Sequence, residues 1–127
     1  MITKGHFDVA LDPQSDTEYQ AGRMTIRKTY QGGIEGDSTG QMLSHRTSVE
    51  GSAGYVALEF FTGRLEGKTG SFALQHYGLM NKGESSLTVE VVPDSATDEL
   101  AGLVGEMVIN IEAGAHYYVF EYSFLGV

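Results

Sequence analysis

The chain contains no cysteine and no tryptophan, and only 2 of its 127 residues are proline. Without thiols it can form no disulfide, no cysteine-ligated metal site and no cysteine nucleophile. Basic residues are also scarce, because 8 Lys and Arg stand against 17 Asp and Glu, for a formal net charge of −9. Since proteins bind nucleic acid largely through clustered Lys and Arg, we expect no nucleic-acid partner.

Long apolar runs are absent as well. No run approaches the roughly 20 residues that a bilayer-spanning helix needs, and residues 1–6 lack the apolar region of a signal peptide. We therefore expect a cytoplasmic protein without a membrane partner. The hydrophobic fraction of 41% is sufficient for one packed domain over residues 1–127.

Glycine is abundant, and its 17 copies separate runs rich in Val, Ile, Thr, Tyr and Phe. This pattern is typical of strands joined by tight turns. Eight successive strands with short connections predict an all-β fold, a closed eight-stranded antiparallel up-and-down barrel, with a two-sheet sandwich as the alternative. The expected strands are 3–11, 22–32, 37–49, 54–65, 68–80, 84–92, 105–112 and 115–125.

Two segments lack the strand pattern. Residues 12–21 are polar and predict a loop. In residues 95–102, Ser95 and Asp98 have the spacing of a capping box, and Gly102 could end a helix, so we expect a single helical turn.

The last two strands predict a hairpin with a two-residue turn at residues 113–114. This turn pairs Ile111 with His116 and Met107 with Phe120, and directly opposed residues share one face of a sheet. We expect this face to be buried. It carries Met107, Ile109, Ile111, His116, Tyr118, Phe120, Tyr122 and Phe124.

A second hairpin is expected around a turn at residues 66–67, which pairs Phe61 with Phe72 and Ala57 with His76. Glu59 and His76 then lie diagonally across neighbouring strands, close enough for long side chains to meet. A bulge or a longer turn would reverse one strand relative to the other. With the two-residue turn, one face carries Tyr55, Ala57, Glu59, Phe61, Leu65, Phe72, Leu74 and His76.

Glu59 lies mid-strand between Leu58 and Phe60, where an ionised carboxylate is costly unless it is paired. One interpretation is an acid or base in a cavity, with a raised pKa. The other is a structural partner of tyrosine or backbone groups or of a basic residue. The candidate basic partners are Lys28, Arg46 and Arg64.

His76 and His116 each lie within an apolar strand. An imidazole there could polarise or orient a ligand oxygen, whereas a lone core histidine more often bonds a carbonyl or a carboxylate. We predict Glu59, His76 and His116 as the catalytic set. His45 could join these residues around a metal, but no ligand spacing supports this, so we expect no metal and no cofactor.

Aromatic side chains dominate the predicted inner faces. An eight-stranded barrel has an interior that side chains fill or that holds one small ligand, and aromatic walls with a few polar groups suit an apolar molecule carrying an oxygen function. The predicted ligand-binding residues are Tyr55, Phe61, Phe72, Tyr118, Phe120 and Tyr122.

Several stretches together resemble a bacterial family of small proteins of unknown function with an allene oxide cyclase-like barrel. They are residues 51–59 (GSAGYVALE), 62–76 (TGRLEGKTGSFALQH), 91–95 (VVPDS), 99–103 (ELAGL), 116–118 (HYY) and 121–122 (EY). The resemblance implies a closed eight-stranded barrel that is often a homo-oligomer. By analogy of fold it also suggests a cyclase- or isomerase-like activity that acts through substrate conformation.

Two function hypotheses follow, and the sequence leaves open whether the chain is an enzyme. In the first, the barrel binds a small hydrophobic molecule, with or without a cyclase-like reaction. In the second, a filled barrel is a non-catalytic module for self-association. The motive for the second is a set of outward apolar residues, which usually marks an interface: Val56, Leu58, Phe60, Tyr117 and Val119.

Overall fold

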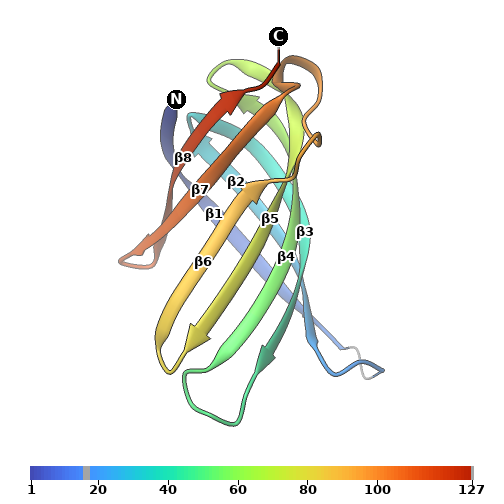
Figure 1. Ribbon diagram of the computed structural model, residues 1–127, viewed down its shortest axis with the longest axis vertical. Coiled ribbons are helices and arrows are strands. Elements are labelled where there is room, and N and C mark those ends of the chain that lie inside the picture. Colours follow the sequence, from blue (N-terminus) through green and yellow to red (C-terminus); the bar gives the residue numbers. More distant parts are fainter. Residues whose placement is uncertain (16–17, 127) are drawn as a thin grey trace.

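The computed structural model describes residues 1–15 and 18–126. Eight antiparallel strands form a closed barrel in which each strand pairs with the next along the chain and β8 pairs with β1, as Figure 1 shows. The predicted all-β up-and-down barrel is therefore confirmed. The strands are β1 (Ile2–Gln14), β2 (Gly22–Gly32), β3 (Ile34–Arg46), β4 (Ala53–Leu65), β5 (Lys68–Asn81), β6 (Glu84–Val91), β7 (Leu103–Glu112) and β8 (Ala115–Phe124).

Tight two-residue turns set the register of the hairpins. At Glu66-Gly67 and at Ala113-Gly114, both residues have φ between 47° and 82°. This backbone matches the right-handed twist of the flanking strands, and glycine adopts it without strain. Both predicted registers are confirmed, since β4 and β5 align Phe61 with Phe72 and β7 and β8 align Met107 with Phe120.

Some strand bounds differ from the predicted ones. β1 continues through Gln14 into the segment expected to be a loop, and β3 begins at Ile34 rather than at residue 37. The extension of β1 pairs with β2 and that of β3 pairs with β4, so backbone hydrogen bonding continues where side-chain alternation gives no signal. Of the predicted loop 12–21, residues 16–17 lie outside the described residues.

The expected helical turn is a 3₁₀ helix, η1 (Asp98–Leu100), with Thr97 at its N-cap. The predicted capping box is wrong, because the hydroxyl of Ser95 instead accepts a hydrogen bond from the backbone N–H of Ala73, at 3.0 Å. That bond ties the connection between β6 and β7 to β5. Gly102 follows the turn with a φ of 86°, as predicted for the residue that ends it.

The hydrophobic core fills one end of the barrel. Leu100 of η1 is completely buried and packs into it. Aromatic rings make up much of this core, with neighbouring ring centroids 5.0–6.1 Å apart. The core aromatics are Phe7, Tyr30, Phe61, Phe72, Tyr118, Phe120 and Tyr122.

At the other end of the barrel, the strands β7 and β8 do not extend as far as the remaining six (Figure 1). The β7–β8 hairpin ends partway along the barrel, above the turns that join β3 to β4 and β5 to β6, as Figure 1 shows. Beyond the pair of Phe7 with His116, β1 continues without a partner on β8. Among the described residues, β6 and β7 share the single pair of Glu90 and Glu106.

Strand alternation directs several apolar side chains toward the interior at this end, yet they remain accessible to solvent. Leu11, Met80, Leu87 and Ile111 are 50%, 44%, 42% and 66% exposed. The prediction that Ile111 is buried is therefore wrong. Among the described residues β6 does not pair with β7 at this end, and β1 pairs with β8 only as far as His116, the residue opposite Ile111. The barrel thus has a packed half and an open half. Among the described residues there is no helix long and apolar enough to cross a membrane.

Candidate functional site

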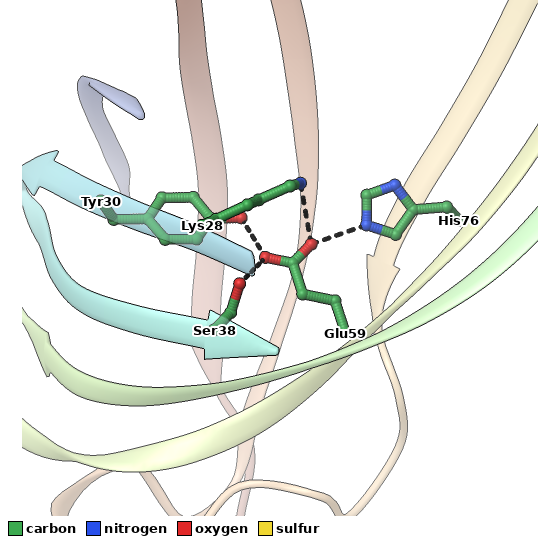
Figure 2. Close-up of polar contacts among 5 residues, drawn as sticks. All are labelled: Lys28, Tyr30, Ser38, Glu59 and His76. Carbon is green, nitrogen blue, oxygen red and sulfur yellow. Dashed lines mark hydrogen bonds and ion pairs between the residues drawn. The ribbon is translucent and has the colours of Figure 1, made fainter. Parts of the chain in front are cut away.

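A buried carboxylate lies at the boundary between the packed and open halves. Glu59 has no solvent exposure, and its two oxygen atoms accept four hydrogen bonds, drawn in Figure 2. Lys28 Nζ lies 2.9 Å from Oε1 and His76 Nε2 lies 2.8 Å from the same atom. Ser38 Oγ donates to Oε2 at 2.6 Å, and the Tyr30 hydroxyl donates to Oε2 as well.

These groups come from four consecutive strands and meet because of their register. Lys28 on β2 is aligned with Ser38 on β3, and His76 on β5 is aligned with Ala57, two residues before Glu59 on β4. The inward position aligned with Glu59 on β3 is Gly40. Because Gly40 has no side chain, the carboxylate has room to extend across β3 toward β2.

The network determines the ionisation of its members. Burial alone would raise the pKa of Glu59, but the hydrogen bond from His76, the charge of Lys28 and the hydroxyls of Ser38 and Tyr30 outweigh it and lower the pKa to about 2. The expectation of a raised pKa for Glu59 is therefore wrong, and a role of Glu59 as an acid or base stays a prediction. Burial and the adjacent Glu59 charge together raise the pKa of Tyr30 well above its usual value.

The structural interpretation of Glu59 is thus supported by its contacts. Of the three candidate basic partners, Lys28 forms the ion pair, whereas Arg64 pairs with exposed Glu35 and Arg46 is exposed at the end of β3. A carboxylate has about four lone-pair positions for hydrogen bonds, and all four are used here. Glu59 therefore holds the surrounding donors in place and has no free acceptor position for a ligand.

His76 and His116 both face the interior, but only His76 contacts Glu59. The His116 ring is half-buried and packs on Phe7, with ring centroids 5.2 Å apart. Phe7 in turn lies beneath the ammonium of Lys28, which is 4.5 Å from its centroid. His116 also lines a notch of about 340 Å³ where β1 passes the end of the β7–β8 hairpin. The predicted catalytic set is therefore split between the network and this notch.

The six predicted ligand-binding residues occupy two environments. Phe61, Phe72, Phe120 and Tyr122 pack among themselves in the core. Tyr118 is buried with them, where its hydroxyl accepts from the backbone N–H of Ile34 at 2.8 Å and donates to a backbone carbonyl. Tyr55 alone of the six is half-buried on the open side. Ligand contact by these residues stays a prediction.

Sequence reasoning did not single out Tyr30 and Ser38 as members of the site. Tyr30 shares its strand face with Lys28, and Ser38 is the aligned partner of Lys28, so extending the alternation analysis to β2 and β3 would have placed both beside Glu59. The described residues contain no group of three or more His, Cys, Asp or Glu placed to hold a metal ion. The network is accordingly one of hydrogen bonds and a single ion pair.

The fold and the site together define a class of protein: a small closed antiparallel barrel, packed at one end, with a buried Glu–Lys–His network at the inner end of its open half. A family model described as "Protein of unknown function (DUF3224)" matches residues 3–122. The chain belongs to this family. A search of curated proteins gave no match.

One similar solved structure is a DUF3224 family protein of unknown function from Shewanella oneidensis MR-1. It is 45% identical to this chain, with a TM-score of 0.95, over 100% of this chain and 98% of the other. The expected family resemblance and the barrel it implied are confirmed. The similarity assigns no activity, because that protein is itself described as one of unknown function.

Proposed function

We propose that the protein binds a small hydrophobic molecule with an oxygen function in the open half of the barrel. The observation that carries this proposal is the exposure of inward-facing apolar side chains at this end, above all Leu87 and Ile111. Apolar surface in contact with water costs about 25 cal/mol per Å². A ligand that covers these side chains would recover that free energy.

The shape and polarity of the open half support a ligand of this kind. Ligand sites are concave and mostly apolar, with a few polar groups that fix orientation. Here the apolar positions lead inward to Lys28 and His76, which are 7% and 5% exposed. The apolar inward-facing positions are Leu11, Met24, Met42, Tyr55, Leu87 and Ile109.

The chemistry of the site favours binding over covalent catalysis. Glu59 is ionised, fully hydrogen-bonded and has a low pKa, so it is a weak base. A reaction in this site would depend on holding the substrate in one conformation. The cyclase-like activity suggested by the resemblance rests on fold analogy alone, and we leave it out of the proposal.

A pair of matched variants tests the proposal. Leu87→Asp places a charge on the inner face of β6, and Leu79→Asp places the same charge on the outer face of neighbouring β5, where Leu79 is similarly exposed at 47%. Native mass spectrometry of the purified protein and thermal-shift screening of apolar ligands would identify a ligand. We expect Leu87→Asp to weaken its binding about tenfold or more, and Leu79→Asp to leave it unchanged. Equal binding by both variants would overturn the proposal.

A second candidate function is self-association through the outer wall of β3, β4 and β5. Val56, Leu58 and Phe60 are 44–58% exposed there, and Leu43 and Tyr77 extend the patch through their alignment with Val56. Leu43, Val56, Leu58 and Phe60 border a groove of about 1080 Å³. Tyr117 and Val119 lie on β8, away from this patch, so the outward set does not form one surface.

Charge favours a second copy of the chain as the occupant of this groove. Arg27 lines it, whereas Glu90, Glu106 and Glu121 are aligned across β6, β7 and β8 on the outer face. Analytical ultracentrifugation tests this candidate. We expect an oligomer that Phe60→Asp dissociates and that Ile111→Asp, at an exposed position on the inner face of β7 and outside both surfaces, preserves. A strict monomer at high protein concentration would remove this candidate.

A further inference from the structure

Glu59 uses all of its hydrogen-bond acceptor positions, whereas Lys28 and His76 each have polar atoms or hydrogens without a partner among the described residues. Glu59 accepts four bonds and is saturated. Lys28 carries three N–H donors, and within the described part of the chain only one of them has an acceptor. His76 likewise bonds Glu59 through Nε2 and makes no further hydrogen bond to a described residue.

The bond to Glu59 determines the state of the His76 ring. An ionised carboxylate only accepts hydrogen bonds, so Nε2 carries a hydrogen and donates it. In the neutral ring Nδ1 is then an acceptor. Among the described residues, every side-chain nitrogen and oxygen atom that is inaccessible to solvent has a hydrogen-bond partner. The unpartnered Nδ1 of His76 is therefore accessible to a molecule from outside.

Lys28 and His76 lie next to each other on the Glu59 carboxylate. Lys28 Nζ and His76 Nε2 both bond Oε1 of Glu59, at 2.9 and 2.8 Å, so these two nitrogen atoms cannot be farther apart than the two distances combined. Nδ1 of His76 is two bonds from Nε2 around the imidazole ring, as Figure 2 shows. Together they offer ammonium donors beside a ring nitrogen that accepts a hydrogen bond or takes up a proton. A carboxyl group has two oxygen atoms and one exchangeable proton, which complements this pair.

We propose that Lys28 and His76 bind the carboxyl group of an apolar acid whose chain occupies the open half of the barrel, and that binding takes up one proton at His76. This inference rests on the proposed ligand-binding function. One carboxylate oxygen accepts from the Lys28 ammonium, and the other accepts from the newly protonated Nδ1 of His76. No bond other than the N–H bond forms or breaks, and the proton comes from solvent.

Charge balance explains the proton uptake. The charges of Glu59 and Lys28 already cancel, so a second carboxylate would be an uncompensated charge in a nearly dry site, which is costly. Protonation of His76 restores neutrality. The titratable groups near His76 on the inner face are Glu59 and Tyr55 on β4, and Lys28 and Tyr30 on β2, which bond Glu59. Its aligned neighbour on β6, Val89, does not titrate.

The length of the open half suits a medium-length chain. On β4, the distance from Glu59 to Ala53 at the end of the strand is roughly 20 Å, at about 3.3 Å per residue. Three probes of equal chain length isolate the contribution of the head group: decanoic acid, methyl decanoate and 1-decanol. The ester carries neither charge nor donor, and the alcohol has one donor but no charge.

Isothermal titration calorimetry of the wild-type protein with each probe, at neutral pH in phosphate and in Tris buffer, tests the inference. We expect decanoic acid to bind about tenfold or more tightly than methyl decanoate. We also expect its enthalpy of binding to differ between the two buffers. For the uptake of one proton, this difference equals the difference between the ionisation enthalpies of phosphate and Tris. The alcohol and the ester should show no such difference.

The outcomes separate the two proposals. Ester binding as tight as acid binding, or acid binding without a buffer dependence, overturns the carboxyl inference and leaves the pocket intact. Binding of none of the probes overturns both. His76→Gln retains a donor for Glu59 but cannot take up a proton, so we expect it to lose the buffer dependence and the preference for the acid while it still binds the ester.

Discussion

Nε2 of His76 lies 2.8 Å from Oε1 of Glu59, across the neighbouring strands β5 and β4. The two residues are not aligned with each other, because His76 is opposite Ala57 and Glu59 is opposite Leu74. They meet along the diagonal of the ladder, on the inner face. This contact links the buried carboxylate to the open half of the barrel, since Glu59 positions the imidazole and His76 has the free ring nitrogen.

The first prediction concerns the ion pair of Glu59 with Lys28. Glu59→Gln leaves the Lys28 charge buried without its counter-charge, and we expect a loss of about 3 kcal/mol in the free energy of unfolding, measured by urea denaturation. The matched control is Glu35→Gln, which breaks the exposed ion pair with Arg64 and should cost less than about 1 kcal/mol. Equal losses in the two variants would contradict a stabilising role for the network.

The second prediction concerns acid stability. The pKa of Glu59 is lowered from 4.5 to about 2 by folding, so the folded state prefers the ionised form. The stability contributed by this ionisation, about 3 kcal/mol, is complete above pH 4.5 and is lost as the pH falls toward 2. The difference in unfolding free energy between the wild type and Glu59→Gln should therefore shrink over this interval. A difference that stays constant down to pH 2 would show that the pKa of Glu59 is not lowered.

The third prediction separates packing from ligand contact at Tyr118. Its buried hydroxyl accepts a hydrogen bond from the N–H of Ile34, and Tyr118→Phe leaves that N–H without a partner. We expect the free energy of unfolding to fall by about 1–3 kcal/mol, with no change in the affinity for an apolar ligand. Tyr77→Phe, at an exposed position on β5, is the control and should be neutral. A weakened ligand affinity with unchanged stability would instead place Tyr118 at the ligand.

The fourth prediction concerns the seam between β6 and β7. Glu90 and Glu106 are the one aligned pair there among the described residues, and like charges directly opposite one another destabilise a sheet. Glu90→Lys replaces repulsion by attraction, and we expect a gain of about 0.5–1 kcal/mol together with slower amide exchange in β6 and β7. Glu84→Lys makes the same change in net charge opposite Asn81 and should give neither effect.

Local sequence patterns were sufficient to predict much of the barrel. Alternation along 54–65 and 68–80, with a glycine at position 67, predicted the register that brings Glu59 and His76 to the same face. Alternation also directs Tyr30 and Ser38 inward on β2 and β3, but their bonds to Glu59 depend on the registers of two further strand pairs. The sign of the Glu59 pKa shift depended on these partners and on Lys28, and burial alone predicted the opposite sign.

The amino-acid sequence by itself determined which side chains face inward, because the period of two in a strand and the geometry of a two-residue turn are local properties. Only the tertiary structure decided which inward-facing side chains are buried. Phe61 and Ile111 both point to the interior, yet one is 1% and the other 66% exposed. The difference arises where strand pairing ends. Beyond Phe7, β1 has no partner on β8, and among the described residues β6 pairs with β7 only at Glu90, so solvent reaches the inner face there.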